Sequence, residues 1–299
     1  MTCAQCEVMS PLEPVRDKLT SGLRGLLSGN MSGVKDGCFE GDPGLCGPGS
    51  TSWEVLADPA AMVAGIRSLL LQSCHPSAIQ GVDEHSGFES DPLGRLHRTV
   101  AYVTVSTFGA VPEAQRMADL VIKAHQNVKG VRPDGVPYDA NDPRLLLWVH
   151  VALVDSLLRS HQLYGKEVLT EIQQDAFVDE QSRIVALLGV TDAPRTSLEL
   201  KECLDGFRSE LYSTEPAIRS VRFIKNPPLP KAYKPFYKLL FAGAAATLDE
   251  EHRVLLGLTA RQITGLQRTG TGAMCGALRA LLREPESRVI AERRAAYRA

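Results

Sequence analysis

The sequence predicts an all-α protein, and three observations favour that class. Apolar residues recur with a helical period along nearly the whole chain, whereas the strand-like alternation of Val, Ile and Thr is scarce. Asp-Pro pairs at 58–59, 91–92 and 142–143 each place a capping carboxylate before a proline that suits the first turn of a helix. Four glycines stand where helices are expected to end: Gly109, Gly130, Gly165 and Gly189.

The elements follow from these signals in chain order. The three Asp-Pro pairs begin the helices expected over 59–74, 92–108 and 143–164, and the glycines end the helices expected over 92–108, 112–129, 143–164 and 170–188. The period alone predicts the remaining helices, over 14–28, 197–212, 215–224, 233–246, 249–256, 260–283 and 286–298. The glycine-rich stretch 29–50 and the proline-rich stretch 226–235 have no period and are expected to be connections.

This pattern predicts a single multi-helix domain over residues 47–299. A flexible, Gly- and Cys-containing leader, partly disordered, is expected over residues 1–46, because its composition cannot bury enough apolar surface to offset the entropy of ordering. Deletion through Gly41 is therefore predicted to leave folding nearly intact.

The composition excludes several classes of function. The chain has 299 residues and a formal net charge of -2, so no basic excess points to nucleic acid or to an anionic membrane surface. The longest apolar runs are far shorter than the ~20 residues of a transmembrane helix. The N-terminus has no basic region followed by an apolar one, so a cytoplasmic location is expected. The oligomeric state is left open.

The seven cysteines do not form a recognisable framework. Cys3 and Cys6 form a CxxC pair, and a zinc site with Cys38 and Cys46 is conceivable. The second pair, however, is widely spaced in a Gly/Pro-rich stretch, unlike a short zinc knuckle. Reduced thiols in the leader are the favoured interpretation.

His125 is the first candidate for chemistry. Within the helix expected over 112–129 it is surrounded at helical spacing by apolar residues, namely Met117, Ala118, Val121, Ile122, Ala124 and Val128. From these residues alone, a core histidine with a hydrogen-bonding partner is the favoured interpretation. The alternative is a ligand of a metal or haem iron, which needs a neutral imidazole that is fixed in one tautomer and shielded from water.

A polar stripe on the helix over 92–108 is the second candidate. Arg95, Arg98, Thr99, Tyr102 and Ser106 lie on one face at intervals of three and four residues. Such stripes are most often solvated surface. They can also line a polar pocket in which arginines hold propionates or stabilise negative charge on a bound oxidant.

The other histidines of this region favour structural interpretations. His150 follows an apolar run in the helix over 143–164, and a supporting position beside a cofactor is the lesser alternative for it. His75 is expected at a helix end, His85 in a turn, and His97 away from the arginine stripe. No HExxH, P-loop, G-x-S-x-G or dinucleotide-binding fingerprint is present.

Four separate blocks carry a family resemblance, which spans roughly residues 47–225. They are GPGSTSW at 47–53, LLLQSCHPSAIQGVDEHSGFESDPLGRLHRT at 69–99, AHQNVKG at 124–130 and PYDANDPRLLLWVH at 137–150. In these blocks the chain resembles the family that joins the latex-clearing rubber oxygenases of bacteria to the mycophenolate-pathway oxygenase of fungi.

The resemblance implies an all-α haem b protein in which His125 matches the axial iron ligand of a V-x-x-x-H-x-x-V-[RK] helix. It also implies that Arg95 and Thr99 match an R-x-x-K-T segment on the opposite side of the haem. Arg98 stands where that segment carries lysine, and an arginine stays charged and cannot ligate iron. The acidic base of the rubber enzymes has no matching position, although Asp83, Glu84 and Glu89 are nearby.

Three hypotheses follow. The first is a haem b-dependent oxygenase, using dioxygen or peroxide, that acts on a small intracellular apolar or unsaturated substrate such as an isoprenoid, a lipid or a specialised-metabolite intermediate. His125 would hold the iron, Arg95, Arg98 and Thr99 would act catalytically, and Arg95 and His150 would support the cofactor. The second is a non-catalytic haem carrier or sensor. The third is a metal-free structural protein.

Overall fold

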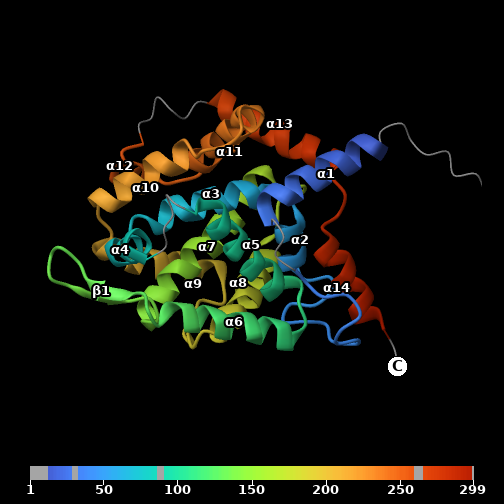
Figure 1. Ribbon diagram of the computed structural model, residues 1–299, viewed down its shortest axis with the longest axis horizontal. Coiled ribbons are helices and arrows are strands. Elements are labelled where there is room, and N and C mark those ends of the chain that lie inside the picture. The colour runs from blue at the N-terminus through green and yellow to red at the C-terminus, as the bar shows by residue number, and fades with distance from the viewer. Residues whose placement is uncertain (1–12, 29–32, 86–90, 259–264, 298–299) are drawn as a thin grey trace, which may run out of the picture.

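The computed structural model describes residues 13–28, 33–85, 91–258 and 265–297 (Figure 1). These ranges are built almost entirely of helices, which confirms the predicted all-α class. The strands within them are β1 (Lys129–Val131) and β2 (Pro137–Asp139), which form one antiparallel hairpin with Gly130 opposite Tyr138. Within the same ranges, no helix is both long and apolar enough to cross a membrane.

The helices of the first half are α1 (Glu13–Ser28), α2 (Thr51–Ala57), α3 (Ala60–Gln72), α4 (Pro76–His85), α5 (Pro92–Phe108), α6 (Val111–His125) and α7 (Pro143–Tyr164). Those of the second half are α8 (Glu171–Ala186), α9 (Ser197–Gly206), α10 (Glu215–Lys225), α11 (Lys234–Ala246), α12 (Glu250–Leu255), α13 (Gly265–Leu281) and α14 (Glu286–Ala296). Short 3₁₀ turns occur at Arg208–Glu210 and Lys231–Tyr233.

The Asp-Pro pairs begin helices as expected. Asp91 accepts a hydrogen bond from the backbone N–H of Gly94, and Asp142 accepts from Arg144 and Leu145. Asp58 accepts from the N–H of Ala60 at the start of α3. Each carboxylate thus satisfies a donor that the first turn of a helix leaves unpaired.

The structure corrects several predicted boundaries. The helix expected over 112–129 ends at His125, and Gly130 lies in strand β1 rather than at a helix end. The region expected as a turn around His85 is helix α4, and α2 begins directly after the glycine-rich stretch. Both missed helices are short, at 7 and 10 residues, so they have too few turns for a periodic pattern to mark them. The first residues of the helix expected over 260–283 lie outside the described part of the chain.

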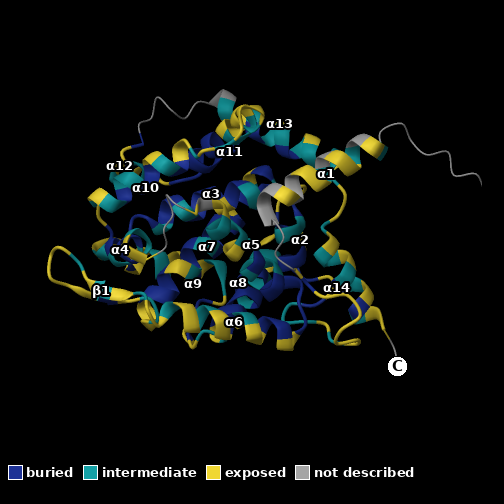
Figure 2. Ribbon diagram, in the orientation of Figure 1, coloured by how far each residue is buried: buried dark blue, intermediate teal, exposed yellow. Residues whose placement is uncertain are grey.

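Helices α3 and α7 form the centre of the molecule, with α11 packed on α3 and α13 on α11. In Figure 1 the elements α10 to α13 form an upper layer, α3, α5 and α7 a middle layer, and α6 with the hairpin a lower one. The buried residues concentrate in the middle layer (Figure 2). An ion pair of 2.7 Å between the buried side chains of Arg67 and Asp155 joins α3 to α7.

The described part of the expected leader contacts the rest of the fold. Val34 is buried in a second small core with Trp53, Phe108 and Ala291. The backbone N–H of Lys35 donates to Glu113 of α6, and that of Gly41 donates to the carbonyl of Arg294 in α14. The domain boundary at residue 46 stays a prediction, but these contacts make us expect that residues 33–46 contribute to stability.

Candidate functional site

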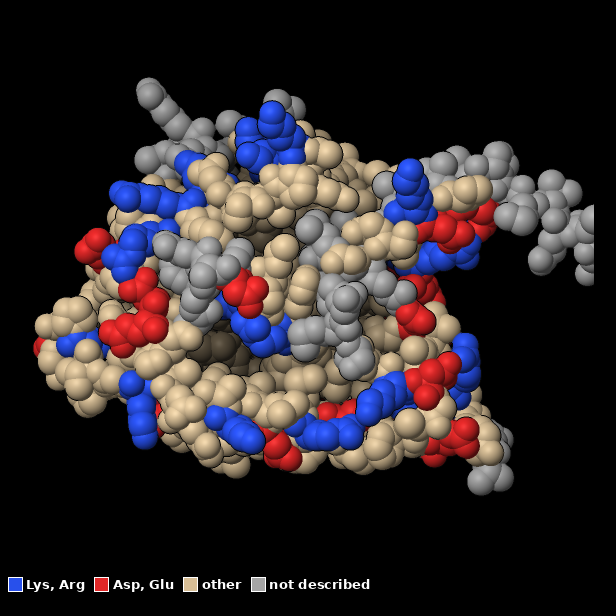
Figure 3. Space-filling view, viewed as in Figure 1, with Lys and Arg blue, Asp and Glu red and all other residues tan. Residues whose placement is uncertain are grey.

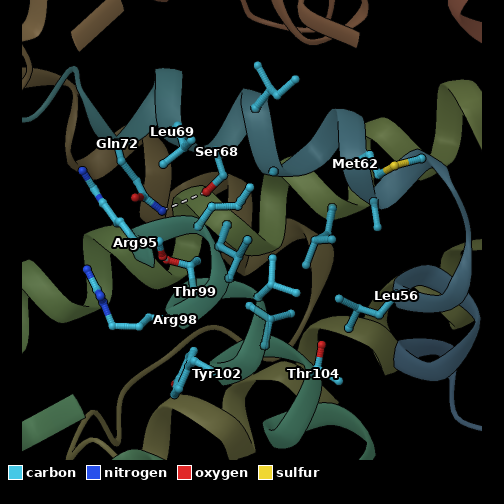
Figure 4. Close-up of a pocket in the computed structure, with 18 of the residues that line it drawn as sticks. Leu56, Met62, Ser68, Leu69, Gln72, Arg95, Arg98, Thr99, Tyr102 and Thr104 are labelled. Atoms are coloured by element: carbon cyan, nitrogen blue, oxygen red, sulfur yellow. Dashed lines mark hydrogen bonds between the residues drawn. The ribbon is translucent and has the colours of Figure 1, made fainter. Parts of the chain in front are cut away.

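A large cavity runs along α3, α5 and α7 and has a volume of about 1870 Å³. Pockets for drug-sized ligands are usually about 300–1,000 Å³. The five predicted site residues all line this cavity, although they come from three helices: Arg95, Arg98, Thr99, His125 and His150. Figure 4 shows the part between α3 and α5, where Arg95, Arg98 and Thr99 lie at one end and Leu56 and Met62 at the other.

The middle of the cavity is apolar because three helices turn one face toward it. The residues of these faces recur every three or four positions, and they are Met62, Ile66 and Leu69 on α3, Val100 and Val103 on α5, and Leu153 and Leu157 on α7. Figure 3 shows hollows in one face of the molecule, with Lys and Arg side chains beside the central one. Positive and negative side chains are mixed over this face, as the net charge of -2 suggests.

His125 is the last residue of α6, and the β-hairpin fixes its surroundings. The Asn141 side chain donates to the carbonyl of Ile122 at 3.2 Å, and the N–H of Val128 donates to the carbonyl of His125 at 2.9 Å. The base of the hairpin therefore lies against the last turn of α6. It brings the backbone of Ala140 close enough to the imidazole to affect its pKa.

The His125 ring is suited to be a neutral ligand. Burial lowers its pKa, and the nearby backbone of Ala140 and the charge of Asp139 oppose that shift in part. Nδ1 is buried and has no hydrogen-bond partner within 3.5 Å among the described residues. A neutral imidazole whose Nδ1 is buried in the protein leaves Nε2 as the nitrogen that can bind a metal.

The arginine stripe lies on α5, but its members differ in their surroundings. Arg95 is half-buried, and burial together with the neighbouring Arg98 lowers its pKa. Arg98 lies at the rim and pairs with Asp91 at 3.3 Å. The hydroxyl of Thr99 donates to the carbonyl of Arg95 one turn earlier. Arg95 is thus the predicted residue of this stripe with the most desolvated charge.

His150 faces the cavity from α7. Burial lowers its pKa to about 4, so its ring is neutral near pH 7. The side chain of Gln72 on α3 donates to the carbonyl of the preceding residue, Val149, at 3.3 Å and so fixes the two helices beside this position. The structure thus places His150 in the same cavity as His125, and a supporting role for it stays a prediction.

A cluster around Tyr138 was not predicted from the sequence. The Tyr138 hydroxyl donates to Glu84 and lies 3.1 Å from Nε2 of His85. The hydrogen bond from Tyr138 lowers the pKa of Glu84. The Tyr138 side chain packs against Gly81 and Gly130. A Cβ added at Gly81 would lie 3.4 Å from a carbon of the Tyr138 ring, and a Cβ added at Gly130 would lie 2.9 Å from the Tyr138 hydroxyl oxygen. Tyr138 and His85 line the cavity, but no sequence signal showed that a two-stranded hairpin returns to α4.

His161 is a second cavity histidine that sequence reasoning missed. It lies on the same face of α7 as His150, about three helical turns further along. Its side chain is 4% exposed, and its Nδ1 has no hydrogen-bond partner in the described ranges. It was overlooked because a histidine in the last turn of an amphipathic helix is ordinary, and only the packing of α3 on α7 shows that it faces the cavity.

The remaining candidates fall elsewhere. His75 is buried against Trp148 and lies 3.5 Å from Glu210 in a smaller pocket of about 650 Å³. Cys3 and Cys6 lie outside the described residues. Within those residues, no three His, Cys, Asp or Glu side chains form a group that could hold a metal ion by themselves. A haem iron can be held by a single axial histidine, because the porphyrin supplies the other ligands.

Comparison with known proteins supports the resemblance seen in the sequence. A family model described as "ER-bound oxygenase mpaB/B'/Rubber oxygenase, catalytic domain" matches residues 53–281. Two uncharacterised proteins, from Mycobacterium bovis and Mycobacterium tuberculosis, are each 30% identical over 102 residues, which is 34% of this chain. The match spans only 39% of the length of these relatives. No solved structure matches significantly.

Proposed function

This chain belongs to the mpaB and rubber oxygenase catalytic-domain family, and from that premise we propose that it is a haem b-dependent oxygenase acting on a small apolar or unsaturated substrate. The observation that carries the proposal is the cavity itself. It combines a half-buried histidine with a lowered pKa, a partly desolvated arginine and a long apolar wall.

The residues present fit a haem. Nδ1 of His125 is buried, and the backbone of Ala140 lies near the imidazole, so Nε2 would be the nitrogen that binds iron. Arg95 provides a cation that can pair with a propionate, and charge-assisted hydrogen bonds of this kind are about twice as strong as neutral ones. Haem, when bound, supplies an iron at which dioxygen or peroxide is activated.

The rest of the cavity suits a substrate. Its volume of about 1870 Å³ is well above the range of a single drug-sized ligand, so space is left beside a haem. The apolar side chains of α3, α5 and α7 would bind a hydrocarbon chain and exclude water from the reacting end. An isoprenoid, a lipid or a specialised-metabolite intermediate would meet these requirements.

Polar groups of the chain would manage charge and protons. We assign Arg95 to stabilise negative charge that develops on the oxidant or to hold a propionate, with Arg98 and Thr99 positioned around it. His150 would remain neutral and would shape the same end of the cavity. The Tyr138 hydroxyl, which lies between Glu84 and His85, would relay protons between these two side chains at the edge of the cavity.

One observation favours a second function, a non-catalytic haem carrier or sensor. Arg98 is paired with Asp91 at the rim, and the Thr99 hydroxyl is bonded to its own helix. Arg98 and Thr99, which are both assigned to catalysis, are therefore already engaged within the protein.

Two assays separate these functions. An absorption spectrum with a pyridine haemochrome assay tests for haem b. Turnover of an alkene-bearing isoprenoid with dioxygen or peroxide, measured by oxygen consumption and product mass, then distinguishes an oxygenase from a carrier. Haem binding without turnover by either oxidant would support the carrier.

A further inference from the structure

We infer that the polar end of the cavity, between Gln72 of α3 and His150 of α7, binds a hydroxyl group of the substrate. The inference rests on the proposed function and deepens it, because it names the chemistry of the substrate that this cavity takes. The hydroxyl donates its proton to the side-chain oxygen of Gln72 and accepts the ring N–H of His150. The substrate class is therefore an apolar alcohol or phenol rather than a pure hydrocarbon.

The Gln72 side chain presents an open acceptor to the cavity. Its Nε2 donates to Oγ of Ser68 at 2.8 Å and to the carbonyl of Val149 at 3.3 Å. Because a carbonyl only accepts hydrogen bonds, the bond to Val149 fixes which end of the amide is the nitrogen. Among the described residues Oε1 has no hydrogen-bond partner, and it is not one of the unpartnered atoms that the protein seals from solvent. Since Gln72 lines the cavity, a ligand can reach this oxygen.

The neighbours of Gln72 set the level of this site in the cavity. Figure 4 shows the Gln72 side chain at the same end as Arg95. The bond to the carbonyl of Val149 places the amide against the backbone of α7, one residue before His150. Because the proposed function assigns Arg95 to the oxidant or to a propionate, Gln72 and His150 are the groups left for a polar part of the substrate.

His150 offers its ring nitrogens to the same end of the cavity. The residue lines the cavity and is half-buried. Within the described ranges neither nitrogen has a hydrogen bond, and neither is sealed from solvent by the protein. Burial lowers the pKa of His150 to about 4, so near pH 7 the ring is neutral. It then has one N–H that donates and one bare nitrogen that accepts.

A hydroxyl matches these two groups better than other polar groups do. It both donates and accepts, so it can pair with the Gln72 oxygen and with the His150 N–H at once. A carboxylate or a ketone only accepts, and it would leave the Gln72 oxygen without a proton. An amine is charged near pH 7, and the half-buried cation of Arg95 at the same end disfavours a second one. An analogue without the hydroxyl leaves both protein groups unpaired, which makes them a source of selectivity.

The test compares three probes of the same length: octanol, heptyl methyl ether and nonane. Each displaces a fluorescent apolar dye from the purified full-length protein. The affinities are compared within one preparation, so a partly unfolded sample leaves their ratios unchanged. The alcohol-to-ether ratio reports the proton that only the alcohol donates, and the ether-to-nonane ratio reports the hydrogen bond that the oxygen accepts.

Gln72→Met keeps the size of the side chain and removes the acceptor. It is expected to lower the alcohol-to-ether ratio about tenfold, the effect of one hydrogen bond, and to leave the ether-to-nonane ratio unchanged. His150→Leu is expected to lower the ether-to-nonane ratio by a similar factor. Wild-type ratios in both variants would overturn the inference.

Gln174→Met is the matched control. The Nε2 of Gln174 also donates to a backbone carbonyl, that of Leu169 at 3.1 Å, but Gln174 is not among the residues that line the cavity. Both ratios are expected to stay at the wild-type values in this variant. A fall in the alcohol-to-ether ratio as large as that of Gln72→Met would mean that the effect does not arise at the cavity wall, and the inference would fail.

The haem content of the same preparations keeps this result separate from the proposed function. Haem-loaded protein in which Gln72→Met and His150→Leu leave the ratios unchanged would remove only the present inference. Lowered ratios in these variants of a protein that takes up no haem would remove the proposed oxygenase and leave the hydroxyl site in place.

Discussion

Arg98 and Asp91 form an ion pair at the rim of the cavity, with Nη1 3.3 Å from Oδ2 and with 58% and 59% of the two side chains exposed. Exposed pairs of this kind contribute about 0.2–1 kcal/mol. Arg98 is thus held at the surface by the residue that caps its own helix, whereas Arg95, one turn earlier, is partly desolvated.

This difference predicts unequal effects of two substitutions. Arg95→Ala is expected to lower haem affinity or kcat/KM about 10- to 100-fold, because it removes a hydrogen bond from a charged, partly buried group. Arg98→Ala is expected to change either quantity less than about fivefold. Haem titration and steady-state turnover measure both. Equal losses in the two variants would show that Arg98 leaves Asp91 and enters the site.

Arg98→Lys gives a second, spectroscopic prediction. A lysine that stays paired with Asp91 cannot reach the iron, so the ferric spectrum is expected to match the wild type, and cyanide and imidazole are expected to shift the Soret band in both proteins. Electron paramagnetic resonance provides the measurement. A higher low-spin fraction in the lysine variant would mean that position 98 faces the iron.

The pKa of His150 predicts a pH-dependent stability. The folded pKa is about 4 and the unfolded value is about 6.5, so the unfolded chain binds the proton more readily between these values. The contribution to stability is complete above pH ~6.5 and is lost as the pH falls toward ~4, at about 3 kcal/mol over the whole window. Denaturant unfolding at pH 7 and at pH 4 measures how much unfolding free energy is lost between the two. In His150→Leu this loss should be smaller than in the wild type by about that amount. Parallel losses in wild type and variant would contradict the burial of this ring.

Val34 tests whether the segment before residue 47 belongs to the folded domain. Val34 is 7% exposed in the small core with Trp53, so Val34→Ala is expected to cost about 1–2 kcal/mol of unfolding free energy. Val136→Ala, at a valine that is 44% exposed, is the control and should stay within about 0.5 kcal/mol. Chemical denaturation measures both. If Val34→Ala behaved like the control, the segment would be a separable leader.

Haem binding should depend on His150 less than on an axial ligand. A group that supports a metal site without ligating it usually changes affinity by about 10–100-fold. His150→Ala is therefore expected to keep haem at micromolar protein concentration while it dissociates faster. Haem transfer to an excess of an apo-globin measures this rate. Complete loss of haem on purification would instead make His150 a ligand.

The sequence predicted the helices that have strong local signals and missed those that depend on packing. Asp91 and Asp142 begin α5 and α7 because a carboxylate and a following proline act within one turn. Helix α4 was missed because its polar end, at Glu84 and His85, resembles a turn. The hairpin that ends α6 at His125 depends on pairing between β1 and β2, which no local pattern specifies.

The same distinction holds for the candidate site. Arg95 and His125 could be named from their helix faces and from the family blocks, and the structure places both on one cavity. His161 and Tyr138 could not be named from the sequence, because only the packing of elements that are distant in the sequence places them at the cavity. The Tyr138 hydroxyl meets Glu84 of α4, and His161 faces the cavity because α3 and α7 pack side by side.

The most direct test of the central claim is the haem content of three proteins purified in parallel after supply of haemin: wild type, His125→Ala and His252→Ala. His252 shares with His125 a buried Nδ1 without a hydrogen-bond partner but is not among the residues that line the cavity. The expected result is a Soret band and one haem b per chain by pyridine haemochrome in the wild type and in His252→Ala, with little or none in His125→Ala. A wild-type protein without a Soret band, or equal haem in all three, would contradict the assignment of His125 as the iron ligand.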